Sequence, residues 1–132
     1  MGINRLNPDT MYHSPAFTQV ATVSSGMKLI FVGGQNGITK DGKVAGDDIA
    51  SQTEQALRNV AAALEAAGAG FKDVVKMTIY LVQGQSFSEG YAATTRVIPR
   101  DTPAPTVSGM LVAGLANPAY LVEIEAVAAV VE

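Results

Sequence analysis

The chain has 132 residues, 48% of them hydrophobic and 16% charged, which is long and apolar enough for a single domain with its own core. A net charge of -3 and scattered Lys and Arg residues argue against a nucleic-acid-binding protein, which needs clustered basic groups to contact phosphates. The absence of cysteine excludes disulfides, thiol nucleophiles and Cys-ligated metals.

The first third of the chain predicts two strands. Residues 17–23 (FTQVATV) and 28–34 (KLIFVGG) are rich in β-branched and aromatic side chains, and the Ser-Ser-Gly sequence between them is typical of a turn. The dipeptides Asn-Gly at 36–37 and Asp-Gly at 41–42 predict further turns in which glycine takes a positive φ. We therefore expect a looped segment between the second strand and the next regular element.

Residues 47–68 give the strongest helix signal in the chain. Asp47 or Asp48 can cap the N-terminus, where a negative charge also suits the positive end of the helix dipole, and Gly68 is typical of a residue that ends a helix. A mainly apolar stripe recurs at helical spacing and consists of Ile49, Gln52, Thr53, Ala56, Leu57, Val60, Leu64 and Ala67. The alanines in this stripe predict a helix that lies close to the element on which it packs.

The second half of the chain predicts three strands and a weaker helix. Residues 73–82 alternate between apolar and polar side chains, which is typical of a strand with one buried face. Residues 86–98 favour a helix, although Gly90 and two threonines lower its propensity. After a proline-containing loop, residues 106–115 and 120–131 predict the last two strands, with an Ala-Asn-Pro turn between them.

The predicted order β-β-α-β-α-β-β corresponds to an α+β sandwich in which two helices cover one face of a sheet. Segments 28–33 and 120–131 are apolar on both sides, so the other face of the sheet would expose an apolar patch on a monomer. We expect further copies of the chain to cover this face in a closed homo-oligomer. The polar N-terminal segment and the lack of an apolar run of transmembrane length predict a cytoplasmic protein without membrane contact.

Few residues suit a recognised metal, phosphate or nucleophile site. His13 is the only histidine and lies in a polar stretch, so a surface position is favoured over a catalytic triad, and a metal site has too few ligands. The GGQNG segment at 33–37 lacks the Lys-Ser/Thr of a phosphate-binding loop and is interpreted as the turn that ends a strand.

Glu123 and Glu125 share one face of the last predicted strand, because side chains two residues apart in a strand point the same way. Two interpretations stay open. Both carboxylates face solvent or pair with basic side chains, or one of them lines a pocket at a subunit boundary. A partly buried carboxylate in such a pocket could position or protonate a small substrate or a water molecule.

Three segments together resemble the Rid/YjgF family of reactive intermediate deaminases, which is also described as the endoribonuclease L-PSP family. They are IFVGGQNG, QTEQALRNVAAALEAAGAGFKDVVKMTIYL and LVEIEAVA, and the resemblance extends from about residue 14 to residue 131. It implies a chorismate-mutase-like fold and a homotrimer with a central barrel and ligand clefts between subunits. It also implies hydrolysis of reactive enamines and imines to ammonia and a 2-keto acid, without a cofactor.

Part of the family's site is matched by this chain. By the resemblance, Glu123 corresponds to the glutamate that positions the attacking water and is the candidate catalytic residue, and Glu125 is the next acid of that motif. Gly34 and Gln35 are retained from the family's Ser-Gly-Gln sequence, whereas Gly33 replaces the serine. Gly33 and Gly34 are therefore candidate substrate-binding positions.

Other positions depart from the family's site. Phe17 replaces a tyrosine and lacks its hydroxyl, and Tyr91 falls near the family's asparagine. Active members have an arginine in a Pro-Ala-Arg segment that binds the substrate carboxylate through two parallel hydrogen bonds, but in this chain Pro105 occupies its place. Proline offers neither a positive charge nor an N–H donor. Phe17, Tyr91 and Pro105 are candidate substrate-binding residues of a more apolar cleft.

These departures lead to two main hypotheses. The first is a RidA-like enamine or imine deaminase-type hydrolase that acts on a less anionic metabolite, for example an aromatic one, with Glu123 acting on water. Arg96 or Arg100 could then supply the missing positive charge, although a helix-surface and a loop position are favoured for them. The second is a non-catalytic binding or sensor trimer. A nucleic-acid or translation-directed role is least favoured by the acidic composition.

Overall fold

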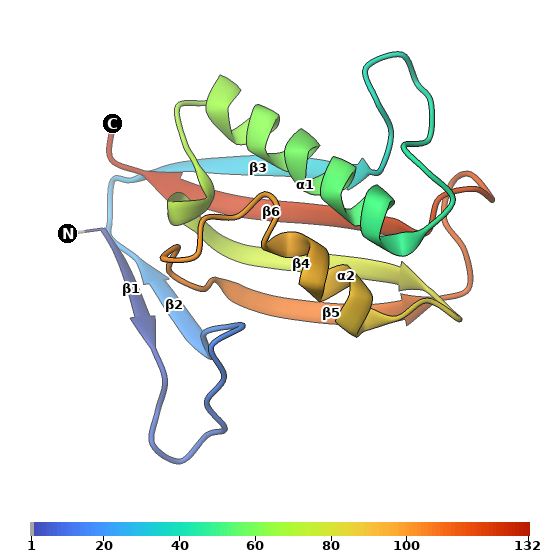
Figure 1. Cartoon of the computed structure of the whole chain (residues 1–132). Helices are drawn as coiled ribbons and strands as arrows, with labels where there is room; N and C mark the ends of the chain where they lie inside the picture. Colours follow the sequence, from blue (N-terminus) through green and yellow to red (C-terminus); the bar gives the residue numbers. More distant parts are fainter. Residues whose placement is uncertain (1) are drawn as a thin grey trace.

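A four-stranded mixed sheet with both helices on one face forms the body of the molecule (Figure 1). The strand order is β3-β6-β4-β5, in which β4 and β5 are parallel and the other neighbours are antiparallel. The computed structural model describes residues 2–132. Its elements are β1 (Ile3–Leu6), β2 (Val20–Val23), β3 (Lys28–Asn36), α1 (Ile49–Ala66), the 3-10 turn η1 (Phe71–Asp73), β4 (Val74–Val82), α2 (Phe87–Thr94), β5 (Thr106–Val112) and β6 (Val122–Val130).

The N-terminal strand β1 is absent from the sequence-based prediction. It pairs with β2 in a separate two-stranded sheet that extends away from the main sheet (Figure 1). Its four residues are too few to produce a recognisable alternation. Arg5 attaches this hairpin to the start of β4, because its Nη2 donates to the carbonyl oxygens of Lys72 at 3.1 Å and Val74 at 2.9 Å. The predicted strand at 17–23 is likewise shorter and begins only at Val20.

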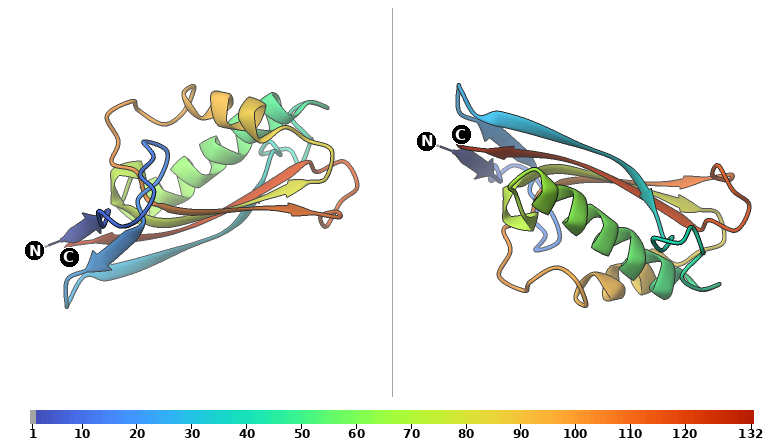
Figure 2. Two further views of the ribbon diagram at one scale, coloured as in Figure 1. Left: turned by 90° about the horizontal axis from the view of Figure 1, so that it is seen from below. Right: turned by 90° about the horizontal axis from the view of Figure 1, so that it is seen from above.

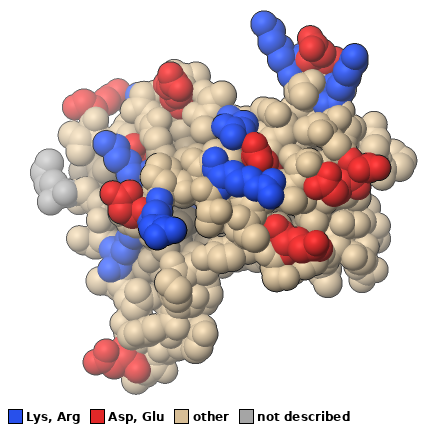
Figure 3. Space-filling model, viewed as in Figure 1, with Lys and Arg blue, Asp and Glu red and all other residues tan. Residues whose placement is uncertain are grey.

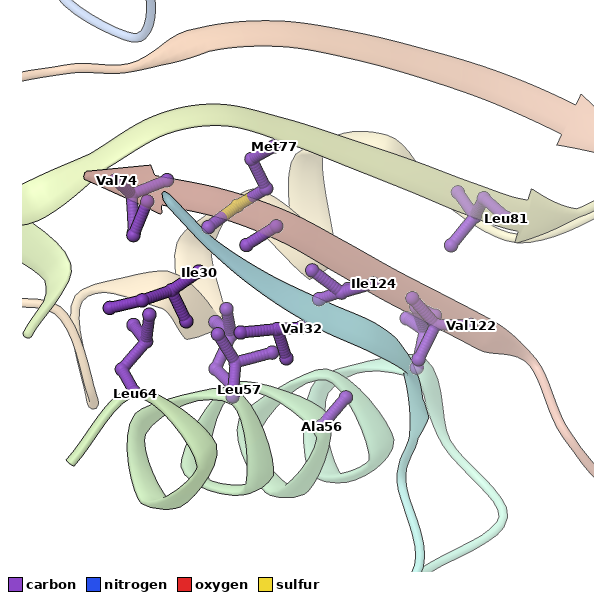
Figure 4. Close-up of a cluster of buried hydrophobic side chains, with 14 residues drawn as sticks. Ile30, Val32, Ala56, Leu57, Leu64, Val74, Met77, Leu81, Val122 and Ile124 are labelled. Atoms are coloured by element: carbon purple, nitrogen blue, oxygen red, sulfur yellow. The ribbon is translucent and has the colours of Figure 1, made fainter. Parts of the chain in front are cut away.

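Helix α1 forms as its sequence predicts. Asp48 caps the helix by accepting from the Ser51 amide at 2.8 Å, and Gly68 follows the C-terminus with a φ of 81°. Every residue of the predicted stripe is buried except Ala67, which is half-buried. In Figure 4 the α1 side chains Leu57 and Leu64 meet β3 and β6 side chains in one apolar layer. This layer is the core, and burial of its side chains contributes roughly 1.5–3 kcal/mol each.

The polar member of the stripe, Gln52, is fully buried and fully paired. Its Nε2 donates to the carbonyl oxygens of Gly46 at 2.8 Å and Ala119 at 3.0 Å, and its Oε1 accepts from the Leu121 amide at 2.8 Å. The side chain therefore joins the loop before α1 to the loop before β6. A buried polar group with all these partners avoids the cost of an unmade hydrogen bond.

The glycine-rich segment after Val32 corrects the prediction of a turn at 33–37. Strand β3 continues through this segment to Asn36, with an irregular register against β6 between Val32 and Gln35. Gly42 has the expected positive φ of 81°, but Gly37 does not. Glycine is required at position 37 for space, because a β-carbon there would lie 2.5 Å from the Gln52 backbone.

In the second half of the chain the elements occur in the predicted order but are shorter. The helix expected over 86–98 ends at Thr94, and the strand expected over 106–115 ends at Val112. After Thr94 the chain continues in turns, with the amides of Val97 and Ile98 both donating to its carbonyl oxygen. The sandwich is therefore asymmetric, with an 18-residue helix and an 8-residue helix on the same face.

The opposite face of the sheet carries no helix (Figure 2). Ile30 and Val32 of β3 are buried beneath α1, so Leu29 and Phe31 point to the uncovered face, where they are 50% and 74% exposed. Met110 of β5 is exposed on the same face at 41%. Exposed apolar side chains of this size fit the expectation that another copy covers the face, and the homotrimer stays a prediction.

Candidate functional site

The Glu123 carboxylate is held where β3 and β6 pair. Glu123 and Asn36 are directly opposite in the register, and the Asn36 Nδ2 donates to the Glu123 Oε1 at 3.3 Å. A β-carbon on Gly34 would collide with the Glu123 Oε2, so the glycine leaves the space that the carboxylate fills. The neighbouring Gly33 has open space around it. Gly34 and Glu123 are thus brought together as expected, and Gly33 lies beside them in β3.

A hydrogen-bond network from α1 supports this pair. Asn36 also donates to the Val122 carbonyl oxygen at 3.0 Å, which fixes its side-chain amide over β6. The Asn59 Nδ2 of α1 donates to the carbonyl oxygens of Asn36 at 3.1 Å and Ile38 at 2.9 Å, and Gln55 donates to the Asn59 Oδ1 at 3.0 Å. The end of β3 is therefore fixed against the helix, and with it the group that orients Glu123.

Glu125 has a different partner on the same face of the sheet. The Tyr80 hydroxyl donates to the Glu125 Oε1 at 2.7 Å. This hydrogen bond, followed by partial desolvation and the negative charges of Glu125 and Glu123, raises the pKa of the Tyr80 phenol above its ordinary value. Glu125 also lines a shallow hollow of about 380 Å³ with Phe31 and Lys76. Its role is therefore neither that of a fully solvated acid nor that of a simple ion-pair partner.

Three other candidate residues line a hollow of about 420 Å³ on the helix side of the sheet. They are Phe17, Tyr91 and Pro105. Thr18 fixes part of the rim, because its amide donates to the Pro105 carbonyl oxygen at 2.8 Å and its hydroxyl to the Ala104 carbonyl oxygen at 2.6 Å. These bonds hold the segment after Phe17 against the segment that ends in Pro105.

The two groups of candidate residues do not meet within one chain. Thr106, next to Pro105, pairs with Lys76 of β4, whereas Glu123 pairs with Tyr80, four residues further along β4. Four strand residues span about 13 Å and the spacing from β5 to β6 is about 9.5 Å, so the groups are at least about 15 Å apart. They also lie on opposite faces of the sheet. A site that contains all six predicted residues would need more than one copy.

The remaining candidates have clear positions. Arg96 is expected on a helix surface but lies in the turn after α2, because that helix ends at Thr94; it is exposed and paired with Glu54 of α1, its Nη1 lying 3.3 Å from Oε1. Arg100 is exposed in the loop after α2 and lines the larger hollow. His13 is an exposed loop residue whose Nε2 lies 3.0 Å from the Pro8 carbonyl oxygen.

The surface charges and the helices bear on whether nucleic acid, a metal ion or a membrane is a partner. Basic and acidic side chains are interspersed over the face seen in Figure 3, with no large area of positive charge there. Among residues 2–132, no three His, Asp or Glu side chains are grouped to hold a metal ion. No helix in that same range is both long and apolar enough to cross a membrane.

Two residues of the site are missed by sequence reasoning. Asn36 is assigned to a turn by its Asn-Gly sequence, and its contact with Glu123 depends on a strand register that the sequence does not specify. Thr18 carries no motif, and its partners are more than 80 residues away in the sequence. One sequence feature could have indicated that Asn36 belongs to the site: it directly follows the Gly-Gly-Gln segment and continues the same strand.

Comparison with known proteins identifies the family. The family model of endoribonuclease L-PSP matches residues 9–130. The chain belongs to the Rid/YjgF family. The YyfB protein of Yersinia pestis, a Rid family member of unknown function, superposes with a TM-score of 0.87 at 31% identity, over 98% of this chain and 100% of that one. The predicted family and its α+β fold are therefore confirmed.

Two Rid/YjgF relatives with sequence similarity carry different functional names. AldR of Lactococcus lactis, whose name describes a candidate regulator, is 35% identical over 103 residues, which are 77% of this chain and 79% of that protein. The chloroplastic Reactive Intermediate Deaminase A of Arabidopsis thaliana is 35% identical over 77 residues, 58% of this chain and 41% of that protein. The family thus includes proteins named for regulation and for deamination.

Proposed function

We propose that this Rid/YjgF protein is a cytoplasmic, RidA-like homotrimer that hydrolyses an enamine or imine in a cleft between subunits, without a cofactor. Its substrate is a small metabolite outside the standard 2-imino acids. The observation that carries the proposal is the half-buried Glu123 carboxylate, which is oriented by Asn36 and accommodated by Gly34. A carboxylate held in one orientation at the edge of an apolar surface is suited to act on a water molecule.

The assembly completes the site in this proposal. Glu123 and Gly34 lie at the uncovered face, and Phe17, Tyr91 and Pro105 lie on the helix side of the same chain. Leu29 and Phe31 supply the apolar surface on which a neighbouring copy would pack. A neighbouring copy that packs on the uncovered face can bring its own hollow towards Glu123, so one cleft would combine residues of two subunits.

The chemistry requires one water and one proton carrier. Water attacks the imine carbon while Glu123 accepts a proton from it, and a new C–O bond forms. The carboxylic acid then returns this proton to the nitrogen, which gives a carbinolamine. Glu123 next accepts the proton of the new hydroxyl group and transfers it to the nitrogen as the C–N bond breaks, so that ammonia and a carbonyl compound leave. An enamine enters the same route after protonation at carbon converts it to the imine. Neither a redox step nor a metal is needed for this balance.

The substrate class follows from position 105. A proline cannot form the bidentate, charge-assisted hydrogen bonds that an arginine forms with a carboxylate. The aromatic rings of Phe17 and Tyr91 line the same hollow, which favours a larger and less polar substrate. We therefore expect poor turnover of 2-iminopropionate, the standard small 2-imino acid, and better turnover of an imine that carries an aromatic ring.

The test is an ammonia-release assay in which an amino-acid oxidase generates imino acids from alanine and from phenylalanine. The Glu123→Gln variant should lose about 100-fold or more of the enzyme-dependent ammonia release, the usual range for a proton-transferring group. Glu125→Gln removes a neighbouring carboxylate on the same face and is the matched control. Equal losses in the two variants, or unchanged release in Glu123→Gln, would contradict the assignment.

A non-catalytic binder or sensor is the second candidate. It is favoured by Pro105 in the place of an anchoring arginine and by the similarity to AldR, whose name describes a candidate regulator. Absence of ammonia release with both imino acids from a protein that still binds small molecules would select this alternative.

A further inference from the structure

The larger hollow is an apolar chamber between α2 and the sheet. At about 420 Å³ it falls within the range of pockets that take small molecules. Side chains from the sheet form its floor and side chains from η1 and from the turn after α2 form its walls. They include Met77, Ile79, Val107, Phe71 and Ile98. A ligand that enters this chamber must therefore present an apolar body to it.

Arg100 is the one charged residue among the described residues that line this chamber. The ion pairs found in the described part of the chain join Arg58 and Arg96 to Glu54 and do not include Arg100. Its guanidinium is therefore available to a ligand, whereas that of Arg96, four residues earlier, is already paired. An unpaired cation beside an apolar chamber complements a molecule with one anionic group and an apolar body.

Two of the three threonines that line the chamber have already used their hydroxyl protons, and the third, Thr102, carries no charge, so Arg100 is the strongest group for an anion there. The Thr94 hydroxyl donates to the Tyr91 carbonyl oxygen at 2.6 Å, and the Thr95 hydroxyl donates to the Ala92 carbonyl oxygen at 2.9 Å. A hydroxyl has a single proton, so neither group has a second one to donate to an anion. Arg100 carries five N–H donors in a planar arrangement that suits a carboxylate.

We propose that the chamber binds a small aryl-substituted carboxylate, with its ring beneath α2 and its carboxylate on Arg100. The proposal deepens the proposed function, because the chamber includes Phe17, Tyr91 and Pro105, and it names the ligand class of that site. Arg100 reaches the ligand from the loop after α2, not from the strand that Pro105 precedes. The site therefore selects its ligand by a ring and a single charge together.

The test uses 3-phenylpropionate, its neutral amide 3-phenylpropionamide, and propionate as probes in isothermal titration calorimetry on the full chain. The wild-type protein should bind the acid about tenfold or more tightly than the amide, because the hydrogen bonds between a guanidinium and a carboxylate are charge-assisted and those to a neutral amide are weaker. Propionate should bind at least about tenfold more weakly than 3-phenylpropionate, because it lacks the buried ring.

Two arginine variants provide the decisive comparison. Arg100→Gln should abolish the preference for the acid over the amide, whereas Arg96→Gln, the matched control, should leave that preference unchanged. Both residues are exposed, and circular dichroism verifies that each variant is folded. Equal binding of acid and amide by the wild type, equal effects of the two variants, or no binding of either probe at millimolar concentration would each overturn the proposal.

The outcome is independent of the ammonia-release assay. Arg100-dependent binding without any ammonia release would leave this proposal standing and remove the hydrolase assignment. Glu123-dependent ammonia release from a protein whose probe binding ignores Arg100 would have the opposite consequence. No binding of the probes to an oligomer would indicate that a second copy, instead of a ligand, fills the chamber.

Discussion

The Glu123 carboxylate of β6, opposite the end of β3, and the chamber beneath α2 are positioned by different kinds of contact. Glu123 is oriented by Asn36, which is itself held by the Asn59 side chain of α1, so side-chain hydrogen bonds determine its position. The chamber is lined by apolar side chains, with one cation at Arg100. The comparison indicates that the group proposed to act on water and the surface proposed to select the ligand belong to separate parts of the fold.

The largest expected effect comes from dissociating the subunits, so that Glu123 of one copy no longer lies next to the chamber of another. Phe31→Asp places a charge in the exposed apolar surface of β3, where burial against another copy would require its desolvation. We expect a trimer in the wild type and a monomer in this variant, with ammonia release reduced at least about 100-fold.

Size-exclusion chromatography with light scattering measures the subunit number, and calorimetry measures 3-phenylpropionate binding in the same sample. The probe should still bind the monomer, because every residue that lines the chamber belongs to one chain. Lys28→Asp, an exposed position in the same strand whose side chain approaches α1, is the control for added negative charge. A wild-type monomer that retains full activity would contradict a site shared between subunits.

A smaller effect should follow from moving the carboxylate without removing it. In Gly34→Ala the new methyl group would occupy the place of the Glu123 Oε2, so the side chain must rotate away from its position beside Asn36. We expect ammonia release to fall by about tenfold to 100-fold, with little change in the melting temperature, because the carboxylate is the flexible end of a side chain.

The matched control for this variant is Gly114→Ala, the same substitution in the loop after β5, outside the candidate site. A β-carbon on Gly114 meets no atom within 4 Å, and its φ is not in the positive range. This variant should keep the wild-type rate, and binding of 3-phenylpropionate should be unchanged in both. A Gly34→Ala protein with full activity would show that the position of Glu123 is unimportant.

The smallest expected effect is that of Glu125 on the pKa of the Tyr80 phenol, which a pH titration can measure. The Glu125 carboxylate raises the pKa of the Tyr80 phenol, so the neutral phenol is favoured more in the folded than in the unfolded chain. The resulting stability is fully present below the unfolded-state pKa of about 10 and is lost as the pH rises through the higher folded-state pKa.

Ultraviolet absorbance of tyrosinate measures this titration directly. Glu125→Gln should move one tyrosine titration to lower pH, and Tyr80→Phe should remove the same step from the wild-type curve. Ammonia release near neutral pH should stay within about threefold of the wild type in Tyr80→Phe, because the Tyr80 hydroxyl donates its hydrogen bond to Glu125 and not to Glu123. An alkaline titration that is identical in the wild type and in Glu125→Gln would refute the coupling.

The parts of the fold that sequence predicts well are those that local periodicity determines. Helix α1, its cap at Asp48 and its end at Gly68 depend on residues within a few positions of one another. The carboxylate site depends instead on the register that places Asn36 opposite Glu123, and these residues are 87 positions apart. That Gly34 leaves room for the Glu123 carboxylate can be recognised only once this register is known. The four-residue strand β1 and the 3-10 turn η1 are too short for a pattern to identify them.

The chamber could be predicted only in part for the same reason. The apolar character of Phe17, Tyr91 and Pro105 is evident from their identities, but their common location depends on bonds from Thr18 across 86 residues. Arg96 and Arg100 look alike in the sequence. Only the position of Glu54 on α1 distinguishes the paired arginine from the available one.

The single amide of Gln52 has a consequence for how the chain can vary in length. It hydrogen-bonds to the backbone at Gly46, Ala119 and Leu121, so one side chain holds the loop before α1 against the loop before β6. An insertion next to any of these contacts would break hydrogen bonds that position both loops. Extra residues are best tolerated at the tip around Gly42, beyond the last cross-link, and this is where a tag or label can be inserted without moving Glu123.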